Sequence, residues 1–194
     1  MRALRHLLPL VILAVLFGAC QRRVTRIDPN TTTDLSGRWN DSDSRMVAEE
    51  LTKQALMEPW RGRFLDAKKR NPVIIVGVIQ NKSSEHIEAE TFIKDMQRVF
   101  VNAGSVRVVQ NAVLREAMRK ERGDQSQFAS PETQKKFGRE LGADFMVFGT
   151  IFSTEDAVNR KRTVTYQVNL EFADLETNEI VWIGEKKIKK FIAN

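Results

Sequence analysis

Few side chains in the sequence have the types and spacing that metal or nucleophilic chemistry needs. The chain holds two histidines, His6 and His86, and one cysteine, Cys20. A transition-metal site requires several such ligands, so no metal site is predicted. Ser83 and Ser84 lie beside His86, but neighbours at one helix start do not easily face each other in triad geometry, and no G-x-S-x-G elbow is present. We therefore predict no catalytic residues.

The remaining polar patterns do not indicate an enzyme or a cofactor either. Glu49 and Glu50, and likewise Glu85 and Glu88, are expected on helix surfaces or first turns, where solvation and the helix dipole explain them. Gly77 has no phosphate-binding motif around it. The sequence thus predicts no cofactor and no small-molecule substrate.

The strongest chemical signal is at the N-terminus. Arg2 and Arg5 precede an apolar run over residues 7–17, and small residues lead into Cys20. This is the order of a secretion signal, and the run is about half of the roughly 20 apolar residues that a membrane-spanning helix needs. Leu16-Phe17-Gly18-Ala19-Cys20 resembles a lipobox, with Phe17 where leucine is usual. We predict that residues 1–19 are a signal peptide and that Cys20 carries lipid, palmitate included.

The residue after this cysteine indicates in which membrane the protein lies, and the charge of the mature chain limits which classes of partner it can bind. In bacterial lipoproteins aspartate at this position is associated with inner-membrane retention; Gln21 therefore favours the outer membrane, with the domain facing the periplasm. Removal of Arg2 and Arg5 lowers the formal net charge from +6 to +4. The positive residues are scattered, and a secreted protein rarely meets nucleic acid, so no nucleic-acid partner is predicted.

A polar, turn-rich segment over residues 20–43 is expected to be a flexible tether. Fully extended, it would reach on the order of 70 Å. Trp39 is its one large aromatic residue, and two interpretations stay open: the indole folds back onto the domain, or it binds a partner. Residues 44–194 then form the single globular domain that the length and the 42% hydrophobic content allow.

The elements that position these residues follow from hydrophobic periodicity. Strands are predicted where apolar runs are short or alternate strictly, at residues 73–79, 106–109, 144–152, 163–172 and 180–191. Helices are predicted from Asp43 or Ser44 to Glu58, from Glu85 to before Gly104, from Asn111 through Met118, and from Ser130 to Gly142. The fold class is α/β (α+β): one mixed sheet of about five strands with flanking helices and a C-terminal antiparallel hairpin.

Two surface features can each be interpreted in two ways. The loop from Gln80 to Glu85 either presents free backbone N–H groups to an anionic or polar partner group, or is closed by Ser84 capping its own helix. Four lysines crowd the last strand, and they either protect a sheet edge from aggregation or attract an anionic partner; they are Lys186, Lys187, Lys189 and Lys190.

Several stretches together resemble the LpoB family of lipoprotein activators of penicillin-binding proteins. They are Asp34-Leu35-Ser36-Gly37-Arg38-Trp39-Asn40, Val73-Ile74-Ile75-Val76-Gly77, Ser84-Glu85-His86-Ile87, Arg139-Glu140-Leu141-Gly142-Ala143-Asp144-Phe145, and Asp174-Leu175-Glu176-Thr177-Asn178-Glu179-Ile180-Val181-Trp182. The resemblance implies a TolB-N-terminal-like domain that contacts the regulatory domain of a bifunctional peptidoglycan synthase and stimulates it in cell-wall synthesis, with an effect on cell shape. For partner binding we single out Trp39, Ser84, Glu85 and His86.

The tether and the shared motifs leave an alternative function. The best-known activators of this type have a longer tether than residues 20–43 provide. The L-G-A-D and L-x-T-x-E-x-x-W patterns also occur in the curli-secretion CsgG group, so a subunit of an envelope secretion complex is the alternative, and an envelope enzyme is a third. The order of the motifs and the chain's size favour the LpoB family.

Overall fold

The computed structural model describes residues 24–128 and 140–193. The chain divides into two units, with the boundary between Thr32 and Thr33. In the first unit the described residues are irregular apart from a turn, in which the Thr31 amide donates to the Asp28 carbonyl over 2.9 Å. All helices and strands of the described residues belong to the second unit.

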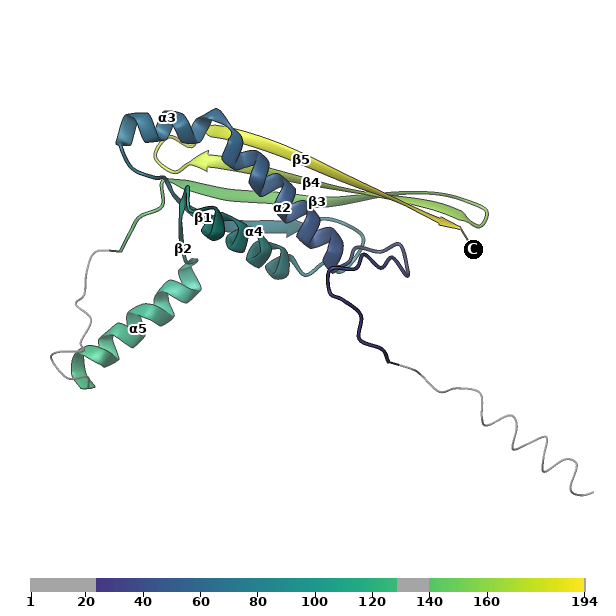
Figure 1. Cartoon of the computed structure of the whole chain (residues 1–194), viewed down its shortest axis with the longest axis horizontal. Coiled ribbons are helices and arrows are strands. Elements are labelled where there is room, and N and C mark those ends of the chain that lie inside the picture. The colour runs from purple at the N-terminus through teal and green to yellow at the C-terminus, as the bar shows by residue number, and fades with distance from the viewer. Residues whose placement is uncertain (1–23, 129–139, 194) are drawn as a thin grey trace, which may run out of the picture. The chain divides into compact units, whose positions relative to one another are not determined.

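A five-stranded mixed sheet forms the centre of the second unit (Figure 1). Its order is β2-β1-β3-β4-β5, in which β1 is parallel to β2 and β3, while β3, β4 and β5 are successively antiparallel. The strands are β1 (Val73–Asn81), β2 (Arg107–Val109), β3 (Phe145–Val158), β4 (Lys161–Asp174) and β5 (Ile180–Ala193). The predicted α/β class, the five-stranded mixed sheet and the C-terminal antiparallel hairpin are confirmed.

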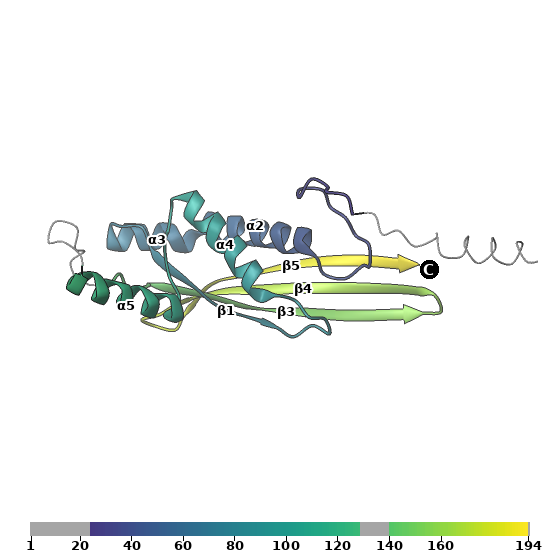
Figure 2. The same cartoon turned by 90° about the horizontal axis from the view of Figure 1, so that it is seen from below.

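Helices cover one face of this sheet. Figures 1 and 2 show α2 (Asp41–Met57) and α4 (Ala89–Ala103) on the same side, with α3 (Pro59–Lys68) following α2. Leu51 of α2 and Phe92, Met96 and Phe100 of α4 are fully buried and pack in one core with the sheet. The remaining helix, α5 (Ala112–Phe128), lies apart from this layer (Figure 2).

The strict alternation of β4 sets which sheet face is dry. Five alternate residues are buried against the helices: Val164, Tyr166, Val168, Leu170 and Phe172. The residues between them stay half-exposed and form the open face of the sheet, as in Thr165, Gln167 and Asn169. This is the pattern of an antiparallel strand with one solvated face, and it confirms the strand predicted from the strict alternation of residues 163–172.

The first helix begins earlier than predicted. Asn40, not Asp43 or Ser44, is its N-cap: the Asp43 amide donates to Asn40 Oδ1 over 3.1 Å, and the Asn40 amide donates to Asp43 Oδ2 over 2.9 Å. This reciprocal pair is a capping box, in which aspartate takes the place of the usual glutamate. Helix α2 ends at Met57, one residue before the predicted end, and Pro59 opens α3, a helix that was not predicted from the sequence.

Two further helix boundaries differ from the predictions. Helix α4 starts at Ala89 with Glu88 as N-cap, so Glu85 does not lie in its first turn. Helix α5 is capped by Asn111, as expected, but continues to Phe128, ten residues beyond the predicted end at Met118. Hydrogen bonds and ion pairs one turn apart, such as Arg119 with Glu116 and Gln125 with Glu121, stabilise this solvent-exposed part.

Several predictions lie outside the described residues or at their margin. The signal peptide over residues 1–19, the lipidation site Cys20, and the start of the helix predicted from Ser130 to Gly142 are not described. None of the helices within residues 24–128 and 140–193 is long and apolar enough to cross a membrane.

Candidate functional site

Lys190 of β5 joins the end of the predicted tether to the folded unit. The residue is 8% exposed, and its ammonium donates to the carboxylate of Asp34, to Asp43 Oδ2 over 2.6 Å, and to the carbonyl of Arg38 over 3.0 Å. We call residues 33–40 the strap. A buried charge is tolerated only when it is paired and hydrogen-bonded, and these three acceptors meet that need. The folded unit therefore begins in the strap, before the predicted boundary at residue 44.

The charges at this junction shift each other's protonation. Burial alone lowers the pKa of Lys190, but the hydrogen bonds to Asp34 and Asp43 outweigh it, so the pKa lies above its ordinary value. The hydrogen bond from Lys190 holds the pKa of Asp34 below its ordinary value, against a smaller opposing effect of burial. Both groups are thus charged at neutral pH, and the strap is held by an ion pair as well as by hydrogen bonds.

Trp39 anchors the strap from the other side. Its indole Nε1 donates to Ser44 Oγ over 2.7 Å, and its ring meets Tyr166 edge-on with centroids 5.4 Å apart. Its backbone N–H donates to Glu85 Oε2 over 3.0 Å, while the Tyr166 hydroxyl donates to Glu85 Oε1 over 2.6 Å. Burial, together with the Glu85 carboxylate, raises the pKa of Tyr166. Of the two interpretations of Trp39, packing onto the domain is what the structure shows.

Gly37 lets the strap lie flat against β5. Its φ of +70° is in the left-handed region, and a Cβ built on it would come within 2.4 Å of the Ile192 side chain. Any other residue would require the Ile192 side chain to move and would adopt a strained backbone. The strap is therefore shaped to fit this strand.

The loop after β1 is closed, but not in the way expected. The Ser84 amide donates to Ser153 Oγ of β3 over 3.0 Å, and the Ser83 amide donates to Asn81 Oδ1 over 3.0 Å. Ser84 does not cap a helix, because α4 begins only at Ala89. Glu85 is engaged internally, whereas His86 is exposed. Partner binding by Trp39, Ser84, Glu85 and His86 stays a prediction.

The four lysines of β5 differ in burial and in contacts, and their spacing in the sequence does not reveal these differences. The strand is an edge of the sheet, as assumed. Lys190 and Lys186 lie on the face toward the helices, where Lys186 pairs with Glu50 of α2 over 2.6 Å. Lys187 and Lys189 are exposed. Lys190 is buried, so it does not guard the edge; it holds the strap.

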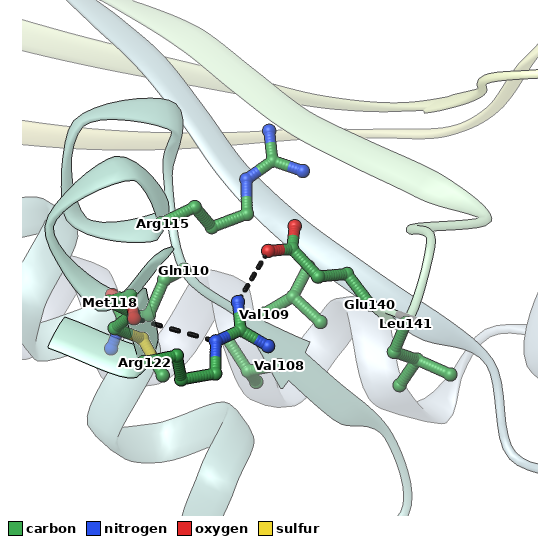
Figure 3. Close-up of a pocket in the computed structure, with 8 residues that line it drawn as sticks. All are labelled: Val108, Val109, Gln110, Arg115, Met118, Arg122, Glu140 and Leu141. Carbon is green, nitrogen blue, oxygen red and sulfur yellow. Dashed lines mark hydrogen bonds and ion pairs between the residues drawn. The ribbon is translucent and has the colours of Figure 1, made fainter. Parts of the chain in front are cut away.

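A pocket of about 250 Å³ lies beside α5 (Figure 3). Arg122 donates to Glu140 Oε1 over 2.7 Å, and Arg119 makes two more bonds to the same carboxylate. These two guanidinium groups lower the pKa of Glu140 to about 2. Arg115 Nε is buried and has no hydrogen-bond partner among the described residues. Among the described residues the lining has no serine, cysteine or histidine, so these residues offer no nucleophile and base pair.

Metal ligands do not gather elsewhere in the described part. Within residues 24–128 and 140–193 no three His, Cys, Asp or Glu residues are placed to hold one ion. The groups that the fold brings together are instead those of the strap junction: Asp34, Trp39, Asp43, Glu85, Tyr166 and Lys190.

Comparison with known proteins found a matching family and several similar solved structures. A sequence model of the peptidoglycan-synthase activator LpoB family matches residues 43–188. Comparison with curated proteins found no match. Among solved structures, the LpoB C-terminal domain from Escherichia coli is similar at 15% identity and a TM-score of 0.48, over 75% of this chain and 98% of that one. Lipoprotein GNA1162 from Neisseria meningitidis is similar at 14% identity and a TM-score of 0.39, over 62% and 83%.

Removal of the strap's buried cation should destabilise the protein. We expect Lys190→Met to lower the free energy of unfolding by about 3 kcal/mol, because it leaves the buried carboxylate of Asp43 without a counter-charge. The matched control is Lys189→Met, an exposed neighbour that should stay within about 0.5 kcal/mol of the unmodified protein. Urea unfolding measures both variants, and equal losses would contradict a special role for Lys190.

The same ion pair predicts a pH dependence. The folded pKa of Asp34 is lowered, so its contribution is present above its ordinary pKa of 3.8 and is lost as the pH falls through the lower folded value. The folded pKa of Lys190 is raised, so its contribution is complete below 10.5 and is lost as the pH rises through the higher folded value. The stability difference between the unmodified protein and Lys190→Met should therefore be constant from about pH 5 to about pH 9. A change of this difference within that range would contradict the assignment to Asp34 and Lys190.

Proposed function

The chain belongs to the peptidoglycan-synthase activator LpoB family, and on that premise we propose that it binds a bifunctional peptidoglycan synthase and stimulates both of its activities. The partner is the regulatory domain of a penicillin-binding protein, and the activities are glycan polymerisation and peptide crosslinking. The observation that carries this proposal is the family match over residues 43–188, which covers most of the folded unit.

The arrangement of polar side chains supports a regulator rather than an enzyme. Glu85, the carboxylate nearest to His86 in sequence, is occupied by the Tyr166 hydroxyl and the Trp39 amide. Glu140 is paired with two arginines that keep it ionised, which does not suit a general acid at neutral pH. The protein therefore acts by binding, and no substrate of its own is required.

We further propose that lipid on Cys20 anchors the protein to the outer membrane, facing the periplasm. Because the strap is fixed to β5 at Asp34, only about 14 residues separate the lipid from the folded unit. At roughly 3.3 Å per residue these span at most about 46 Å. The flexible tether is thus shorter than residues 20–43 would provide. Part of the distance from the lipid anchor to the synthase must therefore be spanned by the folded unit itself.

The activator function predicts a gain in synthase activity. Full-length protein in detergent, added to the purified synthase of the same cell, should increase the rate at which lipid-linked disaccharide-peptide is polymerised and crosslinked. The protein alone should turn over nothing. Turnover without the synthase would support an enzyme, and a stable ring on native sizing would support a secretion-assembly subunit; either result would count against an activator.

Lipidation predicts a specific chemical label. Cells that are given labelled palmitate should attach it to the unmodified protein and not to Cys20→Ser, since Cys20 is the chain's one cysteine. Gln21→Ser, which alters the neighbouring residue and keeps the thiol, is the matched control and should remain labelled. Retention of label by Cys20→Ser would show that the lipid is attached elsewhere or that the signal is not a lipobox.

A further inference from the structure

The folded unit has two distinct ends along its sheet. At one end, the tether end, the strap meets β5 near Lys190, and the loop with Ser84 meets β3 at Ser153. At the other, the far end, α3 and the turn between β4 and β5 come together, and both views show this turn at the opposite end of the strands from the strap (Figures 1 and 2). Ten residues of β5 separate Lys190 from Ile180, a distance of about 33 Å.

Asp144 makes the far end rigid. Its carboxylate accepts two bonds from Arg70, each 2.7 Å long, and one from the Val73 amide over 2.8 Å. Its backbone carbonyl accepts from the Leu175 amide over 2.9 Å, which ties the turn after β4 to the start of β3. The Arg70 guanidinium in turn lies 5.1 Å from the centre of the Phe64 ring. A paired guanidinium fork of this kind fixes geometry as well as charge.

The turn between β4 and β5 is held in the same manner. Asp174 Oδ1 accepts from the amides of Glu176 and Thr177 over 2.8 and 3.0 Å, and the Asn178 amide donates to the Asp174 carbonyl. This leaves two apolar side chains outside: Leu175 is 44% exposed and Ile180 is 52% exposed. Apolar groups held at the surface by a rigid turn suit an interface, because little entropy is lost when they bind.

A pocket of about 280 Å³ opens between this turn and α3. Phe64 and Leu175 form apolar walls, and Lys68 and Glu176 stand at the rim. Among the described lining side chains Lys68 is the one cation, against the carboxylates of Asp144, Asp174 and Glu176, of which Arg70 offsets the first. The pocket therefore combines an apolar centre with a charged rim and a small excess of negative charge, as protein-binding sites often do.

We propose that this far-end pocket is where the synthase docks, through an apolar side chain with a basic group beside it. The proposal rests on the activator function proposed above. The tether supports it: the chain between Cys20 and Asp34 spans at most about 46 Å, and docking at the far end adds the length of the sheet, about 30 Å, to that reach. Docking through the loop with Ser84 and His86, at the tether end, would add nothing.

The test compares substitutions at the two ends. Full-length protein in detergent binds immobilised synthase, and the dissociation constant is measured for Leu175→Lys and Glu176→Lys at the far end. The tether-end control is Phe191→Lys, a residue 67% exposed. His86→Ala tests the alternative site on the loop after β1. We expect each far-end variant to weaken binding by about tenfold or more, as at interface hot spots, and the control to stay within about twofold. The altered side chains are exposed, so all four variants should keep the melting temperature of the unmodified protein.

The outcomes separate the two proposals. If the unmodified protein neither binds nor stimulates the synthase, the activator function fails and the docking site fails with it. If it binds and stimulates, but the far-end variants bind as tightly as the unmodified protein, only the docking site is overturned. Weakened binding by His86→Ala alone would place the partner on the loop after β1 instead.

Discussion

The buried ammonium of Lys190 is the contact on which the N-terminal part of the fold depends. It joins residues 156 and 147 positions away in sequence, Asp34 and Asp43, to the last strand. Asp43 is also the residue that completes the cap of α2, so one carboxylate serves both the helix start and the strap. An uncompensated charge here would be costly, which makes the strap, α2 and β5 mutually dependent.

This dependence has a mechanical consequence for the lipid anchor proposed on Cys20. A tether that merged gradually into a domain would let the domain turn in any direction. Here the chain is bound to β5 at Asp34. In the segment that follows, Trp39 packs against Tyr166 and Gly37 lies against Ile192. The point at which the proposed anchor would pull on the folded unit is therefore fixed at one end of the sheet.

The parts of the fold that could be predicted are those that local pattern determines. Strict alternation identified β4 and its wet face, and an apolar stripe identified α4 and its end at Gly104. The extent of α5, the start of α4 and the strap could not be predicted in the same way. Glu85 looks like a first-turn acid in sequence, yet its partners, Tyr166 and Trp39, lie 81 and 46 residues away. Lys190 looks like its neighbouring lysines until the register with Val164 places it on the buried face.

The same distinction explains why the surface that meets a partner is hard to find from sequence. Motifs such as the run from Asp174 to Trp182 are visible because they build a turn and a strand, and their polar residues are spent on that turn. What such a turn offers to a partner is the side chain that its own hydrogen bonds leave outside, here Leu175. A structural motif can thus mark a binding surface indirectly: the polar residues fix the backbone, and the fixed backbone presents the apolar residue with its conformation already chosen.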